Sequence, residues 1–244
     1  APGWSAWGLV PVPVGRVHGL GEAFLSRGGK LVAQNALGFY RDGGVIKSIR
    51  TGSGESIPGD EIVIAAGTGS KHLARQLGLR LPIAGLAGYS TLLSDSGVDL
   101  KHTVFYPNGG FGMTPYQDAL AVAGTVEFAG LSAKPNWPRA AVLVKRALRV
   151  LPGLQTESRE KRMGRRPFTP DTRPIIGRSA QLANVTFATG HGQLGLTLGA
   201  TTGRLVSAEI AGRAPRVGTQ ALSLKPLRRR RRKKRWQKRG DAPT

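Results

Sequence analysis

Two adjacent arginines followed by a proline, Arg165-Arg166-Pro167, form the first motif of the sequence that could do chemistry. A guanidinium presents a planar fork of N–H donors, which matches a carboxylate in two parallel hydrogen bonds. A site for an amino-acid carboxylate needs such a fork. The alternative is that both arginines are solvated loop charges, a common situation in a chain with a formal net charge of +22.

A glycine-rich segment, Gly190-His191-Gly192-Gln193-Leu194-Gly195, precedes an expected helix over residues 197–211. The unpaired N–H groups and the dipole at a helix N-terminus favour negative charge, so this segment suits an anionic group. His191 has no histidine partner at i+4, and a lone histidine is more typical of a structural role. No metal site is therefore predicted.

A third motif is the apolar run Ile62-Val63-Ile64, which is typical of a strand buried on both faces and ends in Ala65-Ala66-Gly67. Small residues at the carboxyl end of such a strand let a ribose or diphosphate pass close to the backbone. The alternative is a simple tight turn that leads into a helix over residues 70–77.

Hydrophobic spacing and turn residues predict the elements that must position these motifs. They indicate a helix over 17–25, a β-hairpin over 30–50, and strand-like pieces typical of an antiparallel sheet over 82–128. A helix over 138–151 and a strand over 184–188 follow. The sequence thus predicts an α/β (α+β) fold with a second layer or subdomain.

Four ordered segments together resemble the C-terminal part of the FAD-dependent D-amino-acid dehydrogenases, within the wider D-amino-acid oxidase and glycine oxidase superfamily. They are IVIAAGTGS at 62–70, AGTVEFAG at 123–130, MGRRPFTPD with PIIG at 163–177, and GHGQLGLTLG at 190–199. The resemblance runs from about residue 15 to residue 224.

The resemblance implies roles for individual residues. Arg166 is expected to anchor the substrate carboxylate as the catalytic residue, and Tyr89 is expected to face the substrate. Contacts with the FAD cofactor are expected from Ala66, Gly67, His191, Gly192, Gln193, Leu194 and Gly195. The implied activity is that of a flavoprotein oxidoreductase of amino-acid catabolism. It deaminates D-amino acids oxidatively by hydride transfer from the α-carbon to the flavin, and an acceptor such as a quinone takes the electrons.

The resemblance also implies a division of the chain. Residues 1–81 are expected to form part of an FAD-binding Rossmann-like domain, which is incomplete, and residues 82–160 a mostly antiparallel substrate-binding sheet. Residues 161–224 return to the FAD-binding domain, and residues 225–244 form a disordered basic tail.

Two features depart from the family pattern. In the N-terminal part of the chain no strand is followed by G-x-G-x-x-G, so the N-terminal nucleotide-binding unit is expected to be absent. The chain would then be inactive alone, a non-functional gene remnant, or the partner of a separate chain that supplies the N-terminal half. The second departure is Leu86-Ala87-Gly88-Tyr89, where relatives usually carry an acidic–basic pair before Gly-Tyr.

The composition bears on three further questions: nucleic-acid binding, cysteine chemistry and membrane insertion. Of the net charge of +22, residues 225–244 carry +10. Such a block of like charges does not fold alone. With Trp236 available to stack on bases, it suggests a nucleic-acid-binding protein built on an inactive oxidoreductase scaffold. The other interpretation is that the block is an appended extension without a function. The absence of cysteine excludes disulfides and thiolate chemistry. No stretch approaches the roughly 20 apolar residues of a membrane span, so we expect a cytoplasmic chain or one held peripherally at the inner membrane.

Overall fold

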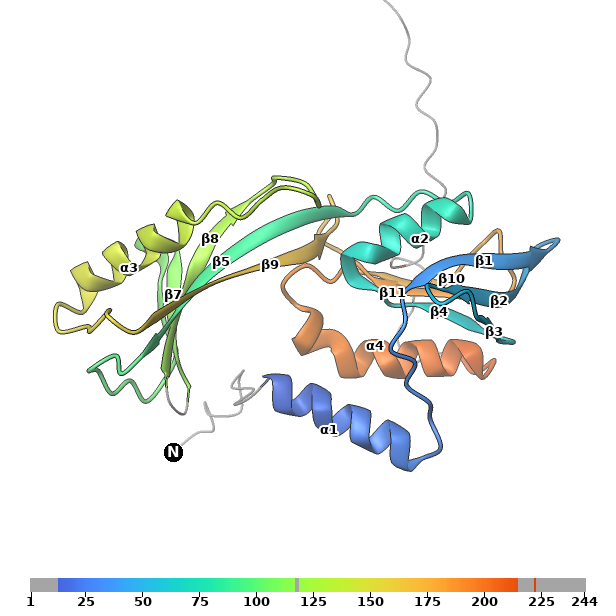
Figure 1. The fold of residues 1–244 in the computed structure, drawn as a ribbon, viewed down its shortest axis with the longest axis horizontal. Coiled ribbons are helices and arrows are strands. Elements are labelled where there is room, and N and C mark those ends of the chain that lie inside the picture. Colours follow the sequence, from blue (N-terminus) through green and yellow to red (C-terminus); the bar gives the residue numbers. More distant parts are fainter. Residues whose placement is uncertain (1–12, 117–118, 215–221, 223–244) are drawn as a thin grey trace, which may run out of the picture.

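The computed structural model describes residues 13–116, 119–214 and 222. Its elements form two parts that lie side by side, an antiparallel sheet with one covering helix and an α/β part (Figure 1). The basic tail, on which the nucleic-acid alternative rests, lies outside the described residues. None of the helices in the described ranges is both long and apolar enough to cross a membrane.

The antiparallel part is a five-stranded sheet with the strand order β6-β7-β8-β5-β9. Its strands are β5 (Ala84–Ser94), β6 (Val104–Tyr106), β7 (Phe111–Tyr116), β8 (Ala119–Glu127) and β9 (Arg159–Phe168), and the 3-10 turn η3 (Pro107–Gly109) lies between β6 and β7. Helix α3 (Pro138–Val150) covers one face of this sheet (Figure 1). Because side chains alternate along a strand, about half of those in each strand point to the face of the sheet on which α3 lies and the others to the opposite face.

The core between α3 and the sheet explains why these segments fold together. Ala140, Leu143 and Ala147 lie on one side of α3 and pack against buried apolar side chains of β5, β7 and β8. Pro138 begins the helix, as the sequence predicts, because its fixed φ suits the first helical turn.

The α/β part is built around a parallel pair of strands, β4 (Ile62–Ile64) and β11 (Val185–Thr189), with β10 (Ile175–Arg178) antiparallel to β11. Helix α4 (Gly195–Ile210) covers one face (Figure 1). The other face packs against α2 (Ser70–Gln76) and the predicted hairpin, which consists of β1 (Ala36–Asp42) and β2 (Val45–Thr51). Three further elements are α1 (Pro13–Ser26), β3 (Ser56–Pro58) and the 3-10 turn η2 (Gly67–Gly69).

A buried amide joins distant segments of the α/β part. The Asn184 side chain donates to the carbonyl oxygens of Ile46 at 2.8 Å and Asp60 at 2.9 Å, and its oxygen accepts from the Ile46 N–H at 2.9 Å. Buried backbone groups are costly when unpaired, so this one residue holds β2 and the start of β4 against β11.

Two expectations from the sequence need correction. The apolar run of β4 predicts a strand buried on both faces, but β4 is an edge strand of its sheet and Val63 is 41% exposed. The expected domain boundary at residue 160 falls inside β9. This strand pairs with β5 from Arg159 to Phe168, so the antiparallel sheet extends to Phe168.

Candidate functional site

Arg166 lies on the face of the five-stranded sheet opposite α3. It pairs with Leu86 of β5, and its guanidinium extends over the neighbouring residue on that face, Gly88. The Nη1 atom of Arg166 is buried and has no hydrogen-bond partner within the described part of the chain. Burial lowers the pKa of this guanidinium from its usual value. A guanidinium with a desolvated, unpaired Nη1 is suited to a carboxylate that completes its hydrogen bonds.

Gly88 leaves the space that the guanidinium uses. A Cβ atom at this position would overlap Nη1 of Arg166. The opposite residue on β9, Gly164, has open space where its Cβ would be, so the requirement for glycine is specific to position 88. Sequence reasoning quotes Gly88 only as part of a departure from the family pattern, because its role depends on which strand lies beside it.

The Ala66-Gly67 turn and the end of β11 lie together. β4 and β11 run parallel with Ile64 opposite Phe187, so both strands end at the same edge. The Thr189 hydroxyl donates to the Gly67 carbonyl oxygen at 3.0 Å. Ala66 is exposed, and Gly67 has a φ of +55°, which residues with a Cβ adopt only with strain. The edge where parallel strands end is where ligands bind in open α/β sheets.

The glycine-rich loop 190–195 connects this edge to the strand that carries Arg166. The Gly192 N–H donates to the Pro167 carbonyl oxygen at 2.9 Å, and Gly192 has a φ of +57°. His191 hydrogen-bonds through Nε2 to the Thr202 hydroxyl at 2.9 Å, and burial lowers the pKa of its imidazole. The structure therefore brings the loop next to Arg166, as the expected roles require.

This edge has the features that a bound flavin nucleotide needs. Gln193 and Leu194 are exposed, and α4 begins at Gly195 without an acidic residue in its first turn or a capping side chain. Its first N–H groups are thus available to an anionic ring edge or phosphate. Together with the exposed Ala66-Gly67 turn, the residues present fit one side of an FAD site.

Tyr89 lies away from this site. It is 2% exposed and lies on the α3 face of the sheet, where its ring packs edge to face on Trp137. Its hydroxyl donates to a Glu127 carboxylate oxygen and accepts from the Asn136 N–H at 2.9 Å. The expected contact of Tyr89 with substrate stays a prediction, and the structure does not bring Tyr89 to the face that carries Arg166.

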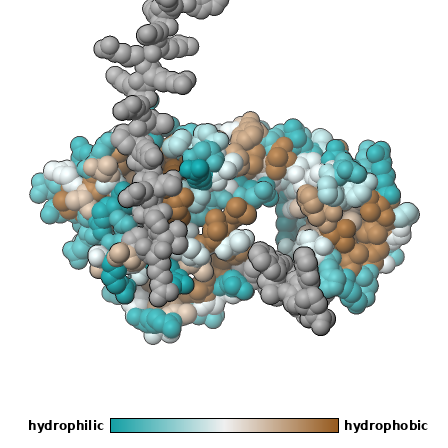
Figure 2. Space-filling model, turned by 180° about the vertical axis from the view of Figure 1, so that it is seen from behind, coloured by the Kyte–Doolittle hydropathy of each residue, from teal (hydrophilic) through white to brown (hydrophobic). Residues whose placement is uncertain are grey.

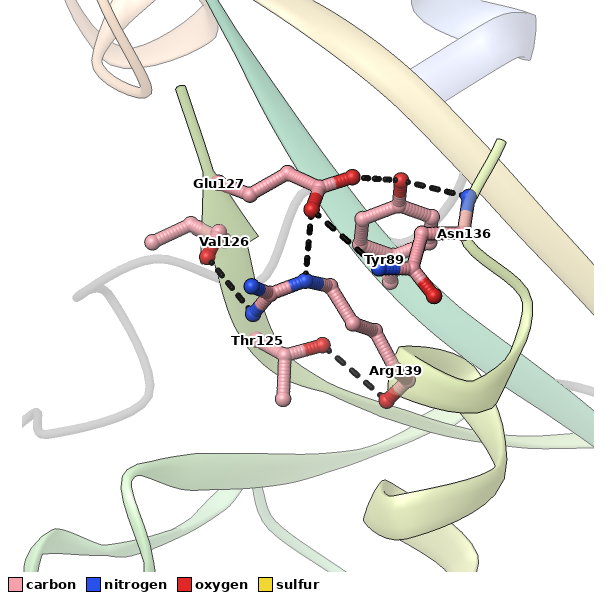
Figure 3. Close-up of polar contacts among 6 residues, drawn as sticks. All are labelled: Tyr89, Thr125, Val126, Glu127, Asn136 and Arg139. Carbon is pink, nitrogen blue, oxygen red and sulfur yellow. Dashed lines mark hydrogen bonds and ion pairs between the residues drawn. The ribbon is translucent and has the colours of Figure 1, made fainter. Parts of the chain in front are cut away.

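Glu127 is the centre of a polar network that sequence reasoning did not identify (Figure 3). Its carboxylate accepts from Tyr89, from Asn136 Nδ2 at 3.4 Å and from Arg139 Nε at 2.7 Å. The network ties the 128–137 loop and the start of α3 to β5. Arg165 lies on the same face of the sheet as Tyr89 and donates to the Ala133 carbonyl oxygen in this loop. Arg165 thus holds the loop, whereas Arg166 lies on the opposite face.

Glu127→Gln is expected to destabilise the fold in a pH-dependent way. The hydrogen bond from Tyr89, and then those from Arg139 and Asn136, lower the pKa of Glu127 below the ordinary 4.5. A carboxyl whose pKa is lower in the folded state stabilises the fold above its unfolded pKa, and this stability is lost as the pH falls through the folded value. In urea unfolding, the variant should therefore have a lower midpoint than the wild type at pH 7, and the difference should shrink as the pH falls below 4.5.

Glu160→Gln is the matched control for this experiment. Glu160 also pairs with an arginine, Arg162, but both side chains are exposed, so its loss should leave the midpoint at pH 7 nearly unchanged. Equal midpoints for the Glu127 variant and the wild type at pH 7 would show that the network does not stabilise the fold.

The chain is similar in sequence and in fold to known proteins. The family model described as FAD dependent oxidoreductase (DAO) matches residues 8–209. The chain is 33% identical over 209 residues to the D-amino-acid oxidase of Bradyrhizobium diazoefficiens, an alignment that covers 84% of this chain and 49% of that protein. It is 37% identical over 186 residues to the D-amino acid dehydrogenase of Methylobacterium nodulans, with 75% and 44% covered.

Among solved structures, iminodiacetate oxidase from Chelativorans sp. BNC1 is similar with a TM-score of 0.75 and 27% identity, over 86% of this chain and 58% of that one. Glycine oxidase from Geobacillus kaustophilus has a TM-score of 0.75 at 22% identity, which is a likeness of fold, over 85% of this chain and 56% of that one. The chain spans about half the length of the curated relatives it matches.

Proposed function

Because the chain belongs to the DAO family of FAD-dependent oxidoreductases, we propose that it forms the substrate-binding side of an enzyme that oxidatively deaminates D-amino acids. The curated relatives described above are named D-amino-acid oxidase and D-amino acid dehydrogenase, and this chain matches about half of their length. The proposal concerns the substrate and the reaction, since family membership alone fixes neither.

The observation that carries the proposal is the unpaired guanidinium of Arg166. It lies on the face of the sheet opposite α3, next to Pro167, whose carbonyl oxygen accepts from the Gly192 N–H of the 190–195 loop. A buried donor without a partner costs free energy, on the order of 1–3 kcal/mol, unless a ligand completes it. An α-amino acid offers a carboxylate of the right shape for this fork.

In the proposed reaction, Arg166 holds the substrate carboxylate in two parallel hydrogen bonds and thereby fixes the position of the α-carbon. Gly88 keeps the guanidinium close to the sheet, and the 190–195 loop closes the side of the site next to α4. FAD, when bound along the Ala66-Gly67 turn and the 190–195 loop, supplies the hydride acceptor. Such a reaction depends on orientation more than on a dedicated protein base. The imino acid product leaves the site and hydrolyses in water.

The proposal includes partners besides the D-amino acid. Electrons leave the enzyme to an acceptor such as a quinone. The only G-x-G-x-x-G spacing in these 244 residues is Gly190-x-Gly192-x-x-Gly195, between β11 and α4, and the N-terminal segment of this kind that the family pattern requires is not found. On this proposal it reaches the site from another part of the same polypeptide or from a separate chain that carries the N-terminal FAD-binding half.

Flavin retention tests the cofactor side of the proposal. The visible absorption spectrum of the purified chain is recorded after FAD is added and the excess is removed. We expect retained flavin, and bleaching when a D-amino acid is added without oxygen. Gly67→Ala should reduce retention, because its Cβ would occupy the open space beside the turn, where FAD is proposed to bind.

Gly54→Ala is the matched control for Gly67→Ala. Gly54 also has a positive φ, +86°, and open space at its Cβ position, but it lies in the turn between β2 and β3. Both substitutions impose a similar backbone strain, about 1 kcal/mol, so only Gly67→Ala should change flavin binding. No retained flavin in the wild-type chain would refute the activity for this chain alone.

A further inference from the structure

Three apolar side chains share the face of Arg166. Val126 lies directly opposite Gly88 on the neighbouring strand, so it points to the same side as the guanidinium that crosses Gly88. Phe168 is two residues beyond Arg166 on β9 and therefore also lies on this face, about 6.6 Å along the strand. Phe128 follows β8 and packs edge to face on Phe168, with ring centroids 5.7 Å apart.

Two of these side chains are largely exposed, although the edge of one meets the Phe168 ring. Phe128 is 68% exposed and Val126 is 44% exposed. Figure 2 shows hydrophobic residues at the surface next to the hollow between the two parts of the molecule. Exposed apolar groups on the same face as an unpaired guanidinium donor are typical of a ligand site, in which the polar group fixes orientation and the apolar groups bind the rest of the ligand.

Phe128 is exposed although its backbone is held firmly. The preceding residue, Glu127, is bonded to Tyr89 and Arg139, and Arg165 donates to Ala133 further along the same loop. On the other side, a Cβ at Gly192 would lie 3.4 Å from the Phe168 ring, so Phe168 is next to the glycine-rich loop. The aromatic pair is thus fixed between the two segments that border the site of Arg166.

We propose that Phe128 and Phe168, with Val126, form the subsite for the substrate side chain, and that the preferred substrates carry large apolar side chains, aromatic ones above all. The inference rests on the proposed function, because it assumes that Arg166 binds the carboxylate of the same molecule. An aromatic side chain placed on this pair gains edge-to-face contact and removes the exposed rings from water. A short side chain such as a methyl group leaves the pair exposed.

The test compares two carboxylates that differ in their apolar part. Binding of phenylacetate and of propanoate to the intact chain is measured by ligand-observed NMR. The wild type is expected to bind phenylacetate roughly 10-fold more tightly. Phe128→Ala should lower the affinity for phenylacetate and so reduce this preference to about 3-fold or less. Phe105→Ala is the control, since Phe105 of β6 is also 68% exposed on the same sheet, and it should leave both affinities unchanged.

The outcomes separate this inference from the proposed function. If both carboxylates bind in a way that Arg166→Gln abolishes, but without a preference that depends on Phe128 or Phe168, the side-chain subsite is refuted and the carboxylate site stands. If neither carboxylate binds, the carboxylate site is refuted together with the subsite that depends on it. Because Phe128 is exposed, its variant is expected to fold, and circular dichroism checks this.

Discussion

Arg166→Gln is expected to lower propanoate affinity by roughly 100- to 1,000-fold, because it removes two charge-assisted hydrogen bonds to the carboxylate. The same variant should be at least as stable as the wild type, since Nη1 of Arg166 is buried without a hydrogen-bond partner among the described residues. Ligand-observed NMR measures the loss of binding, and urea unfolding measures the stability. Loss of affinity without loss of stability is the signature of a binding residue.

Arg162→Gln is the control for this prediction. Arg162 lies on the same strand and the same face as Arg166, but it is exposed and paired with Glu160. Its replacement should change propanoate affinity by less than about 3-fold. Equal effects of the two substitutions would mean that the basic charge of β9 attracts carboxylates in general, and that Arg166 has no specific site.

Gly88→Ala is expected to weaken carboxylate binding by about 10- to 100-fold, because the added methyl group displaces the Arg166 guanidinium that crosses this position. The atom that must move is the end of a flexible side chain, so the fold itself should tolerate the change. Propanoate affinity and the urea midpoint of the variant are measured together. We expect the affinity to fall while the midpoint changes little.

Gly164→Ala provides the comparison at the opposite position. Gly164 lies directly across from Gly88 on β9, and a methyl group there meets no atom within 4 Å. Its affinity for propanoate should equal that of the wild type. A Gly88→Ala variant that binds as well as Gly164→Ala would show that Arg166 reaches its ligand from another direction.

The parts of the candidate site that can be predicted from the sequence are those that lie within short motifs. Arg166, the Ala66-Gly67 turn and the 190–195 loop each depend on local residue types, and the structure brings the three segments together through Gly192 and Thr189. Their roles toward substrate and flavin remain predictions.

The rest of the site depends on strand register, which the sequence does not state. Because side chains alternate along β5, Tyr89 and Gly88 lie on opposite faces of the sheet. Only the pairing with β9 shows which of the two lies on the same face as Arg166. Glu127 joins Tyr89 and Arg139 only after three separate segments have come together. The exposure of Val63 likewise depends on which face of β4 is covered, because Ile62 and Ile64 on the other face of the same strand are buried.

The arrangement of the two sheets in the chain has a consequence for biosynthesis. All strands of the five-stranded sheet lie in one uninterrupted stretch, from Ala84 to Phe168, whereas β4 pairs with β11, which is synthesised after that stretch is complete. During translation, the antiparallel part can therefore fold as a unit while β4 still waits for its partner. The buried Asn184 amide likewise contacts Ile46 and Asp60 only after that stretch has been synthesised. The face that carries Arg166 can therefore be present on the nascent chain before the edge formed by β4 and β11 is complete.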